Sequence, residues 1–309
     1  MRIAVLGAGG VGGVFGGVLS RAGHDVIFLA RGPHLAAMQR QGLRVLSPHG
    51  DFVIHPAQAT DSTSSLAPVE YVIVAVKHHQ LRAAAASLGA LVAEGTTVVP
   101  LSNGIDVHEI LAEVIGPQSV IGGLCNIVAR IESPGVIRQE SRIQRVVIGE
   151  LDHRPSDRVR RIVNAWREAG VEAIEAEDIH LALWRKFLFI ASFAGVSSLS
   201  RANAGQILTC EPARQLLAQA MEEVAALAQR REIGLPATAV QEAMALLESF
   251  EPTATSSMQR DVADGRPFEL EAFSGAILRL ARQHGLPTPV HAALYALLRP
   301  ALDRALAAS

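Results

Sequence analysis

The chain begins Met1-Arg-Ile-Ala-Val-Leu-Gly-Ala-Gly-Gly-Val-Gly-Gly-Val-Phe-Gly16. The run Arg2–Leu6 is mostly apolar and predicts a buried parallel strand. The glycines after it have the spacing G-x-G-x-x-G. Between a strand and a helix, this spacing permits a tight turn, close approach of the backbone to a pyrophosphate, and close packing of helix on strand. The stretch therefore predicts a dinucleotide-binding loop. Its cofactor-contacting residues are expected to be Gly7, Ala8, Gly9, Gly10, Val11 and Gly12.

The residues after this loop favour a nucleotide-binding fold over two alternatives. A helix ends at Gly23-His24-Asp25, and a second apolar strand follows at 26–30. A flexible glycine-rich arm, the first alternative, would not lead into such a pattern. The second alternative is a signal peptide, because the first nineteen residues are largely apolar. However, only one basic residue precedes the apolar run, and the helix that follows is amphipathic and polar-capped.

Composition narrows the functional classes. The 309 residues suffice for two domains, and a formal net charge of −2 gives no indication of a nucleic-acid partner. The apolar runs are short and interrupted by glycine and charge, so no membrane span is expected. The two cysteines, Cys125 and Cys210, have neither metal-binding spacing nor a disulfide framework. We expect both to be buried small apolar side chains in a reduced, cytoplasmic protein.

The pattern of elements changes near Glu177. Before it, short apolar runs alternate with helical stretches, which predicts an α/β fold with a Rossmann-type, doubly wound and mainly parallel sheet. After it, the periodicity is helical almost throughout. We therefore expect a Rossmann-like nucleotide-binding domain at 1–176 and an all-helical substrate-binding and catalytic domain at 177–309. A ligand is expected in the cleft between them.

Glycines and prolines mark the ends of the expected elements. In the first domain, strands are expected at 2–6, 26–30, 43–46, 52–55, 71–76, 97–101, 120–123, 127–131, 136–139, 145–150 and 171–176, and helices at 16–21, 33–41, 80–93, 106–114 and 156–169. In the second domain, helices are expected at 179–193, 212–232, 237–249, 268–284 and 289–306.

The end of the second strand indicates which dinucleotide is bound. NAD-preferring folds have an acidic residue there for the ribose 2′-hydroxyl, whereas an arginine suits the 2′-phosphate of NADP. Here the strand ends Phe28-Leu-Ala-Arg31-Gly32, without Asp or Glu. Arg31 is therefore predicted to bind the 2′-phosphate of NADP(H). The alternative is a solvated arginine that begins a loop.

Two polar residues follow later strands of the same sheet. Lys77 comes after the strand at 71–76, and Asn103 after the strand at 97–101. Both would lie at the carboxyl edge of the sheet, where Lys77 could neutralise phosphate or bind ribose, and Asn103 could bind the nicotinamide carboxamide or a substrate oxygen. The pair Asn103-Gly104 is also a common turn sequence, so the spacing leaves both readings of Asn103 open.

In the helical half, Lys186 stands among Trp184, Phe187, Leu188 and Phe189. Burial among apolar groups would lower the pKa of this lysine and prepare it for proton transfer. The stem of a lysine also covers apolar surface while its ammonium group reaches water, and the local sequence alone favours this second interpretation.

Further along, Ser256-Ser257-Met258-Gln259 resembles a helix capping box, and Glu269 is expected in the first turn of the next helix. Either stretch could instead turn a serine hydroxyl or a carboxylate toward a ligand, and spacing does not decide.

These residues together resemble the ketopantoate reductase family, the 2-dehydropantoate 2-reductases, over nearly the whole chain. The resemblance is carried by the glycine loop, Val76-Lys77, Asn103-Gly104, Leu183-Trp-Arg-Lys186, Ser256-Ser-Met258 and Glu269. It implies NADPH-dependent reduction of a 2-oxo acid to a 2-hydroxy acid, as in pantothenate biosynthesis. It gives Lys186 the role of catalytic acid, Ser257 that of substrate binding, Asn103 and Glu269 contacts with both substrate and cofactor, and Lys77 a cofactor contact.

The chain departs from the family pattern in the substrate half. The resemblance places asparagines four and eight residues after the catalytic lysine, where this chain has Ile190 and Ala194. A third family asparagine corresponds to Ala204, with Asn203 beside it but out of register. Because hydrogen-bonding groups distinguish substrates strongly, these changes favour a more apolar or differently shaped 2-oxo acid than ketopantoate.

Three hypotheses remain open. The first is a 2-oxo acid reductase, either ketopantoate reductase itself or a paralogue with another substrate. The second is a non-catalytic protein that binds or senses NADP(H). The third is a reductase of another substrate class, such as an opine or a 3-hydroxy acid. A homodimer through the apolar helices after Phe268 is one option, and intradomain packing is the other.

Overall fold

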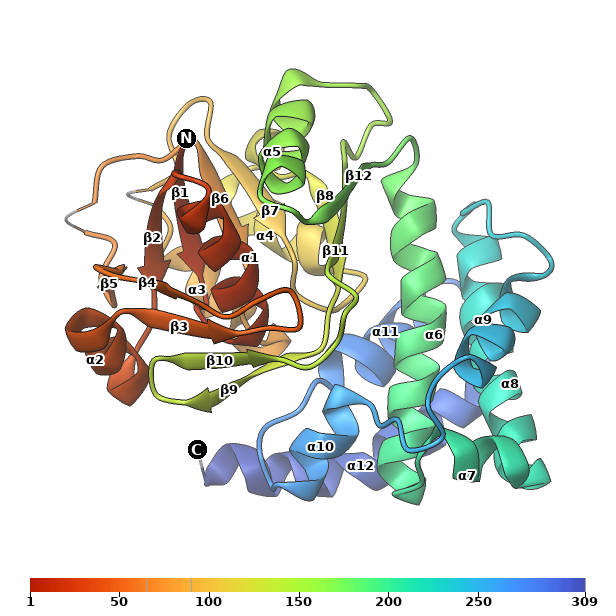
Figure 1. Ribbon diagram of the computed structural model, residues 1–309. Helices are drawn as coiled ribbons and strands as arrows, with labels where there is room; N and C mark the ends of the chain where they lie inside the picture. Colours follow the sequence, from red (N-terminus) through yellow and green to blue (C-terminus); the bar gives the residue numbers. More distant parts are fainter. Residues whose placement is uncertain (65, 90, 309) are drawn as a thin grey trace. The chain divides into compact units, whose positions relative to one another are not determined.

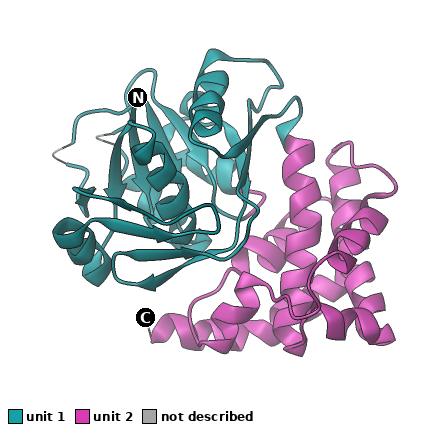
Figure 2. Cartoon of the chain, viewed as in Figure 1, with its two compact units in different colours: residues 1–103, 107–179 teal, residues 104–106, 180–309 magenta. Residues whose placement is uncertain are grey.

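The computed structural model describes residues 1–64, 66–89 and 91–308, and the chain forms two compact units (Figure 2). Unit 1 comprises Met1–Asn103 and Val107–Ile179, and unit 2 comprises Gly104–Asp106 and His180–Ser309. The chain therefore leaves unit 1 directly after Asn103, contributes three residues to unit 2, and returns at Val107.

The centre of unit 1 is a five-stranded parallel sheet with the strand order β5-β2-β1-β6-β7 (Figure 1). The strands are β1 (Arg2–Leu6), β2 (Asp25–Leu29), β5 (Gln58–Thr60), β6 (Tyr71–Val74) and β7 (Thr97–Pro100). The two faces of β1 lie in different apolar cores: Ile3 and Val5 in one, Ala4 and Leu6 in the other. Such a strand, buried on both faces, is the pattern that the run Arg2–Leu6 predicted.

Helices cover both faces of this sheet. Residues of α1 (Gly10–Arg21), α2 (Gly32–Gln41) and α5 (Asp157–Glu168) lie in the core of Ile3 and Val5, and residues of α3 (Leu81–Ala86) and α4 (Val107–Ile115) lie in the core of Ala4 and Leu6. Trp166 of α5 packs edge-on against Phe15 of α1, with ring centroids 6.2 Å apart. The α/β, doubly wound fold class is thereby confirmed.

The remaining strands of unit 1 form two smaller sheets, with the orders β4-β3-β10-β9 and β12-β11-β8. Their bounds are β3 (Leu43–Leu46), β4 (Phe52–Ile54), β8 (Gly122–Asn126), β9 (Ala129–Ser133), β10 (Val136–Gln139), β11 (Arg145–Gly149) and β12 (Glu172–Glu175). Each contains antiparallel pairs, including the expected hairpin β3–β4. The strand β5 was not predicted; it is three residues long and lies at the edge of the main sheet.

Unit 2 consists of helices over the described residues from His180 to 308. They are α6 (Ile179–Ser200), α7 (Ala204–Thr209), α8 (Glu211–Arg230), α9 (Ala239–Glu248), α10 (Ser257–Ala263), η3 (Glu271–Gly275), α11 (Ala276–Gln283) and α12 (Pro289–Ala307). Aromatic rings join α6 to other segments: Phe189 lies 5.5 Å from Phe250, and Phe187 lies 6.4 Å from Phe273, between ring centroids. The helices α7 and α10 were not among the predicted elements.

Two helix predictions need correction. The helix expected at 80–93 is a short 3-10 turn, η1 (His78–Gln80), followed by α3, which ends at Ala86; residue 90 lies outside the described residues. The hydroxyl of Ser87 donates to the Ala84 carbonyl, a local bond that competes with helix continuation. The helix expected at 268–284 begins as the π-helical turn η3 before α11.

One prediction from composition is also wrong in part. Cys125 is buried as expected, but Cys210 is exposed, because it lies at the junction where α7 ends and α8 begins. Among the described residues, one helix, α6, is long and apolar enough to cross a membrane, although no such stretch was expected. Because 67% of its apolar window is buried inside the structure, α6 has the character of a core helix.

Candidate functional site

The glycine loop has the geometry that its sequence predicts. Gly7 has a φ of 96°, a conformation that favours glycine, and it ends β1 in a tight turn. A β-carbon on Gly12 would overlap the carbonyl oxygen of Gly7, so this glycine is required for close packing. By contrast, a β-carbon on Gly9 would meet nothing within 4 Å. The loop therefore has open space at Gly9, where the backbone is expected to approach a phosphate.

The start of α1 suits an anion. Its N-cap is Gly9, without a side-chain cap, and its first turn has no acidic residue. The Gly13 N–H donates to the Gly9 carbonyl at 2.7 Å, which begins the helix directly after the loop. The N–H groups of the first turn and the positive end of the helix dipole then favour a negatively charged ligand. The residues present fit the pyrophosphate of a dinucleotide.

Four candidate cofactor contacts follow four neighbouring parallel strands. Gly7 follows β1, and Arg31, Lys77 and Asn103 come two or three residues after β2, β6 and β7. Parallel neighbours end at the same edge of a sheet, and pairs such as Leu6 with Val74 keep these ends in register. The structure thus brings the glycine loop, Arg31, Lys77 and Asn103 to the carboxyl edge of one sheet, where open α/β sheets bind ligands.

Ser102 joins the two loops that carry Lys77 and Asn103. Its hydroxyl donates to the Val76 carbonyl at 2.7 Å, so the residues just before each candidate are held together. Sequence reasoning missed this serine. The only signal for it was its place directly before Asn103 at the end of a strand.

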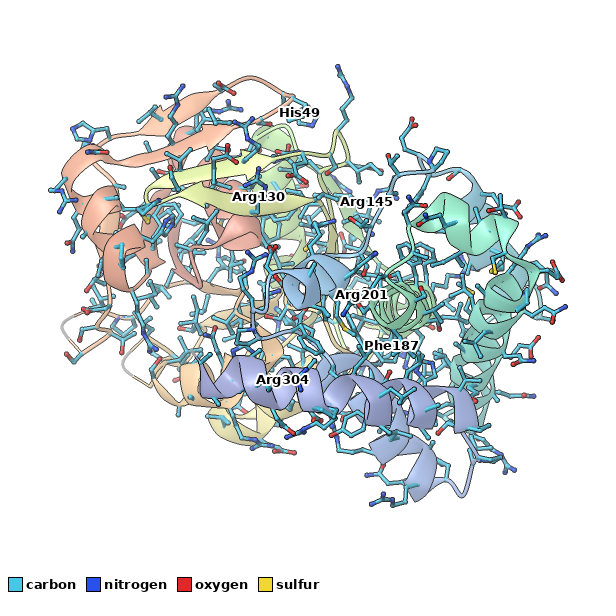
Figure 3. The ribbon with its side chains drawn as sticks, turned by 90° about the horizontal axis from the view of Figure 1, so that it is seen from below. His49, Arg130, Arg145, Phe187, Arg201 and Arg304 are labelled. Carbon is cyan, nitrogen blue, oxygen red and sulfur yellow. The ribbon has the colours of Figure 1, made fainter. Side chains whose placement is uncertain are left out.

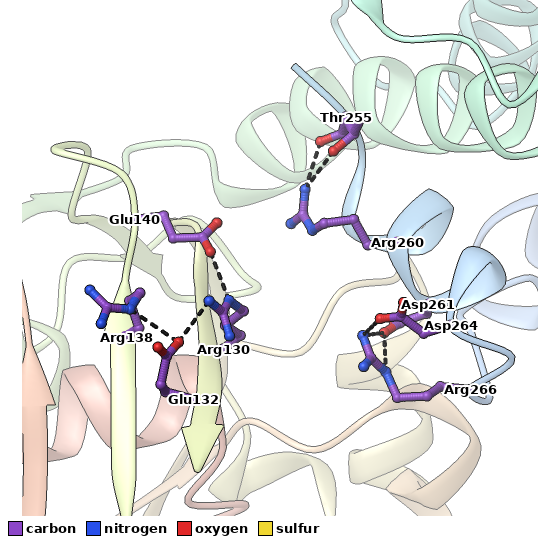
Figure 4. A network of polar contacts seen from close by, with 9 residues as sticks. All are labelled: Arg130, Glu132, Arg138, Glu140, Thr255, Arg260, Asp261, Asp264 and Arg266. Atoms are coloured by element: carbon purple, nitrogen blue, oxygen red, sulfur yellow. Dashed lines mark hydrogen bonds and ion pairs between the residues drawn. The ribbon is translucent and has the colours of Figure 1, made fainter. Parts of the chain in front are cut away.

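Arg31 is exposed and stands at the N-cap of α2. Its side chain has no hydrogen bond or ion pair with any described residue, so its guanidinium group is available to a ligand. Arg130, an arginine of β9, is different: its guanidinium group pairs with Glu132 at 2.7 Å and with Glu140 at 2.8 Å (Figure 4). Because two carboxylates already neutralise Arg130, Arg31 is the better candidate for a phosphate contact.

His34 also contacts the glycine loop, and sequence reasoning missed it. Its Nε2 lies 2.9 Å from the Ala8 carbonyl oxygen, and its Nδ1 accepts a hydrogen bond of 3.0 Å from the Gly135 N–H. The imidazole is partly buried, and desolvation lowers its pKa, with the bond to Ala8 opposing that shift. The lowered pKa favours the neutral imidazole.

In unit 2, Lys186 lies in the second turn of α6 and is partly buried. The next residue, Phe187 (labelled in Figure 3), is 2% exposed. Its ring packs against those of Trp184 and Phe273. This packing fixes the segment of helix from which the Lys186 side chain leaves. Ile190 and Ala194 follow at intervals of four residues, which places them on the same face of α6 as Lys186.

The far end of this helical face contacts the segment around Ser257. Ser197 is buried and lies eleven residues after Lys186, close to the same face; its hydroxyl is 3.0 Å from the Ser256 hydroxyl. Ser256 is the N-cap of α10 and accepts from the Gln259 N–H at 3.0 Å. Ser257, the first residue of α10, is exposed. The expected cap is therefore present, and it leaves the hydroxyl of Ser256 engaged.

The side chain of Gln259 does not complete a capping box at Ser256, since its Nε2 donates to the Ala202 carbonyl at 3.2 Å. The capping box in this region is at α7, between Asn203 and Gln206. Asn203 is thus occupied in capping a helix. Ala204 is fully buried, and its N–H donates to the Ala254 carbonyl at 2.9 Å.

The turn that follows α10 is also fixed by polar contacts. Arg266 pairs with Asp261 at 3.1 Å and Asp264 at 2.8 Å, and Arg260 donates to the carbonyl and hydroxyl oxygens of Thr255, the residue before the cap (Figure 4). Apart from Asp261, which is 8% exposed, these groups lie at the surface, so each contact contributes little to stability, but together they fix the backbone on both sides of Ser257.

Glu269 is 5% exposed and lies just before the π-helical turn η3, and its carbonyl accepts from the Phe273 N–H at 3.2 Å. Phe273 packs on Phe187, so the segments carrying Lys186 and Glu269 meet in one core. Glu269 was expected in the first turn of a helix, but it lies two residues before the first helical turn, which is π-helical and begins at Glu271. Turns of this kind are frequent at functional sites.

Comparison with known proteins shows the family to which the chain belongs. Residues 3–153 match the family model described as ketopantoate reductase PanE/ApbA, and residues 178–301 match the model of its C-terminal part. The 2-dehydropantoate 2-reductase of Halobacterium salinarum is 30% identical over 301 residues, which cover 97% of this chain and 98% of that protein.

Two further similarities extend over the full length. The uncharacterized oxidoreductase YkpB of Bacillus subtilis is 29% identical over 299 residues, 97% of this chain and 98% of YkpB. The crystal structure of a PanE/ApbA family ketopantoate reductase from Ralstonia eutropha gives a TM-score of 0.91 at 26% identity, covering 99% of this chain and 100% of that one. Sequence and fold therefore point to the same family.

Proposed function

Because the chain belongs to the ketopantoate reductase family of oxidoreductases, as its motifs predicted, we propose that it reduces a 2-oxo acid to the 2-hydroxy acid with NADPH. The observation that carries this proposal is the carboxyl edge of the main sheet, where an anion-binding glycine loop and three polar candidates follow four adjacent strands. In this proposal unit 1 binds the cofactor, and unit 2 supplies the catalytic and substrate-binding residues.

The cofactor contacts divide according to the part of NADPH that each residue suits. The first turn of α1 would hold the pyrophosphate, and Arg31 the 2′-phosphate. Lys77 and Asn103, which follow β6 and β7, would bind the rest of the dinucleotide, with Asn103 also touching the substrate. The bound nicotinamide would supply a hydride.

Lys186 would complete the reduction. When the carbonyl carbon of a 2-oxo acid becomes a secondary alcohol, negative charge develops on its oxygen, and an ammonium group stabilises that charge and donates the proton. Lys186 suits this role because the packing of Phe187 fixes its segment of α6. Ser257, whose hydroxyl is exposed at the start of α10, and Glu269 would bind the substrate, and Glu269 would also contact the cofactor.

The substrate is proposed to be more apolar than ketopantoate. The face of α6 beyond Lys186 presents Ile190, partly buried, and Ala194, 3% exposed, where the family resemblance places asparagines. Asn203 does not replace the third asparagine, because its side chain caps α7. Ketopantoate is still one of the candidate substrates, and a role in pantothenate biosynthesis would follow from it.

A panel assay tests this proposal directly. NADPH oxidation is followed with ketopantoate and with 2-oxo acids carrying straight, branched or aromatic side chains. We expect turnover with at least one, and higher kcat/KM for apolar side chains than for ketopantoate. Absence of turnover with the whole panel, by folded protein that binds NADPH, would contradict the proposal and favour another substrate class, such as an opine or a 3-hydroxy acid.

A non-catalytic NADP(H)-binding or sensing protein is the second candidate function. The replacement of polar side chains at Ile190, Ala194 and Ala204 motivates it, since a sensor needs no substrate amides. NADPH binding without turnover of any oxo acid is the result expected for a sensor. For either function we propose a cytoplasmic protein with small-molecule ligands only, without a nucleic-acid or membrane partner, and a homodimer is the oligomer to test.

A further inference from the structure

His34 connects three elements around the glycine loop. It lies in the first turn of α2, three residues after Arg31. One ring nitrogen reaches the Ala8 carbonyl in the loop, and the other reaches the N–H of Gly135, in the turn between β9 and β10. Gly135 is itself fixed, since it has a φ of 79° and its carbonyl accepts from the Arg44 N–H at 2.9 Å. The imidazole therefore ties the loop to a rigid turn.

The two contacts define the hydrogen positions on the ring. The Ala8 carbonyl is an acceptor, so Nε2 carries the hydrogen and donates; the Gly135 N–H is a donor, so Nδ1 is unprotonated and accepts. Both contacts are satisfied only by the neutral Nε2–H tautomer. A side chain in place of His34 that lacked either the donor or the acceptor would keep one of these two contacts and lose the other.

Fixing the Ala8 carbonyl also fixes a donor of the cofactor loop. The peptide that contains this carbonyl also contains the Gly9 N–H, and in a planar trans peptide the two groups point in opposite directions. With the carbonyl held toward His34, the Gly9 N–H points away from it. No described residue accepts a hydrogen bond from this N–H, and the space around Gly9 is open.

We propose that His34 is a positioning residue of the cofactor site, which holds the Ala8–Gly9 peptide so that the Gly9 N–H faces the pyrophosphate and thereby raises the affinity for NADP(H). The inference rests on the proposed function in that it takes the ligand of the loop to be this dinucleotide. It adds a residue that does not touch the cofactor and acts through the orientation of one peptide.

Two substitutions separate the contacts of His34. His34→Gln keeps a donor near the place of Nε2, for the Ala8 carbonyl, and lacks the acceptor for Gly135. His34→Asn keeps an acceptor near the place of Nδ1, for the Gly135 N–H, and lacks the donor for Ala8. His49→Gln is the matched control, because His49 lies in an outer loop of unit 1 (Figure 3). Its Nε2 contacts the Arg142 carbonyl at 2.8 Å, and neither of its hydrogen bonds involves the glycine loop.

The dissociation constant for NADPH is measured by fluorescence titration of each folded variant, with the thermal midpoint measured separately. We expect His34→Asn to raise this constant on the order of 3- to 10-fold, the equivalent of one hydrogen bond. His34→Gln should restore affinity to within about twofold of the wild type, and His49→Gln should match the wild type. Where turnover is measurable, His34→Asn should raise the KM for NADPH and leave kcat at saturating NADPH unchanged.

Equal loss of affinity in both His34 variants, or loss in neither, would overturn this inference, because the Ala8 contact would then not be the one that matters. These results would leave the proposed function intact, since the wild type would still bind NADPH. If folded wild-type protein binds neither NADPH nor NADH, the proposed function fails, and the inference fails with it.

Discussion

Gly12 lies against Gly7 so closely that a β-carbon on Gly12 would overlap the Gly7 carbonyl oxygen and sit 2.8 Å from Val5 Cγ1. This contact joins the first helix to the first strand across the glycine loop. Gly9, in the same loop, has the opposite surroundings, because a β-carbon there would contact nothing within 4 Å. The two glycines therefore differ: packing of the protein requires a glycine at position 12, whereas a side chain at position 9 would enter open space, where we propose that the cofactor binds.

Alanine substitutions at these two positions are expected to separate stability from cofactor binding. Gly12→Ala should lower the free energy of unfolding by about 1–3 kcal/mol, because backbone atoms must move. Gly9→Ala should cost less than about 1 kcal/mol, the difference between glycine and alanine at an N-cap, yet weaken NADPH binding. Urea unfolding and NADPH titration of both variants check this. Wild-type affinity in Gly9→Ala would contradict the assignment of the loop to the cofactor.

Arg31 is expected to decide the choice between NADPH and NADH. Its side chain has no partner among the described residues and stands at the N-cap of α2 after β2. Arg31→Ala should lower kcat/KM for NADPH on the order of 10-fold or more, through loss of a charge-assisted hydrogen bond, and change the value for NADH little. Arg40→Ala, at an exposed arginine of the same helix, is the control. An unchanged ratio of NADPH to NADH would show that another residue binds the 2′-phosphate.

The sequence predicted the parts of the fold that depend on local pattern. The strand Arg2–Leu6 and the glycine loop were correct in detail, because a strand buried on both faces is apolar throughout and glycine spacing reports backbone geometry directly. The division of the other strands into separate sheets could not be predicted, since antiparallel pairs such as β8 with β11 depend on contacts distant in sequence. The length of α3 was overestimated, because alanine-rich sequence favours helix until a single Ser87 intervenes.

The candidate site divides in the same way. Arg31, Lys77 and Asn103 were predicted from their places at strand ends, and the topology puts those ends side by side. His34 and Ser102 were missed, because each acts through a backbone carbonyl of another segment, and no sequence spacing encodes such a contact. The structural role of Asn203 could have been predicted from local sequence, because Asn203 and Gln206 form the capping-box pattern Asn-x-x-Gln. It was missed because Asn203 was compared only with the asparagine of the family.

Lys186 is expected to be required for turnover with every accepted substrate. Lys186→Ala should lower kcat about 10²- to 10⁴-fold, the usual contribution of a positioned acid, with little change in the dissociation constant for NADPH. Arg185→Ala is the control, because Arg185 is the exposed neighbour on α6. Retention of the wild-type rate in Lys186→Ala would show that the assigned chemistry is wrong.

Substitution of Ile190 is expected to shift substrate preference. Ile190→Asn places an amide one helical turn after Lys186, where it can bind a substrate hydroxyl or carboxylate. The ratio of kcat/KM for ketopantoate to that for an apolar 2-oxo acid should rise on the order of 10-fold or more in this variant. Ile190→Leu, which keeps the apolar character, is the control and should leave the ratio close to that of the wild type. An equal ratio in both variants would place the substrate elsewhere.

The stability of the helical unit is expected to fall in mild acid because of His291. This side chain is fully buried in α12, with Nδ1 3.2 Å from the Ser274 hydroxyl in η3 and Nε2 3.1 Å from the Ala220 carbonyl. Desolvation lowers its pKa to about 4. Between the unfolded pKa of 6.5 and this folded pKa, the unfolded chain binds more protons than the folded chain. The contribution of neutral His291 to the free energy of unfolding is therefore fully present above pH 6.5 and declines as the pH falls toward 4.

Urea unfolding at pH 7.5 and pH 5 measures this effect, to which His291 should contribute about 2 kcal/mol in the wild type. Nearby Glu223 accepts from the N–H groups of Val290 and His291, and desolvation raises its pKa, which acts in the opposite direction as the pH falls. The comparison is therefore made between variants that all retain Glu223. His291→Gln keeps a donor for the Ala220 carbonyl but does not titrate, so it should lose less stability between the two pH values. It should also be less stable than the wild type at pH 7.5, because it replaces the buried ring that contacts the Ser274 hydroxyl. The exposed His284→Gln should follow the wild type, and an equal loss in His291→Gln would assign the acid sensitivity to another group.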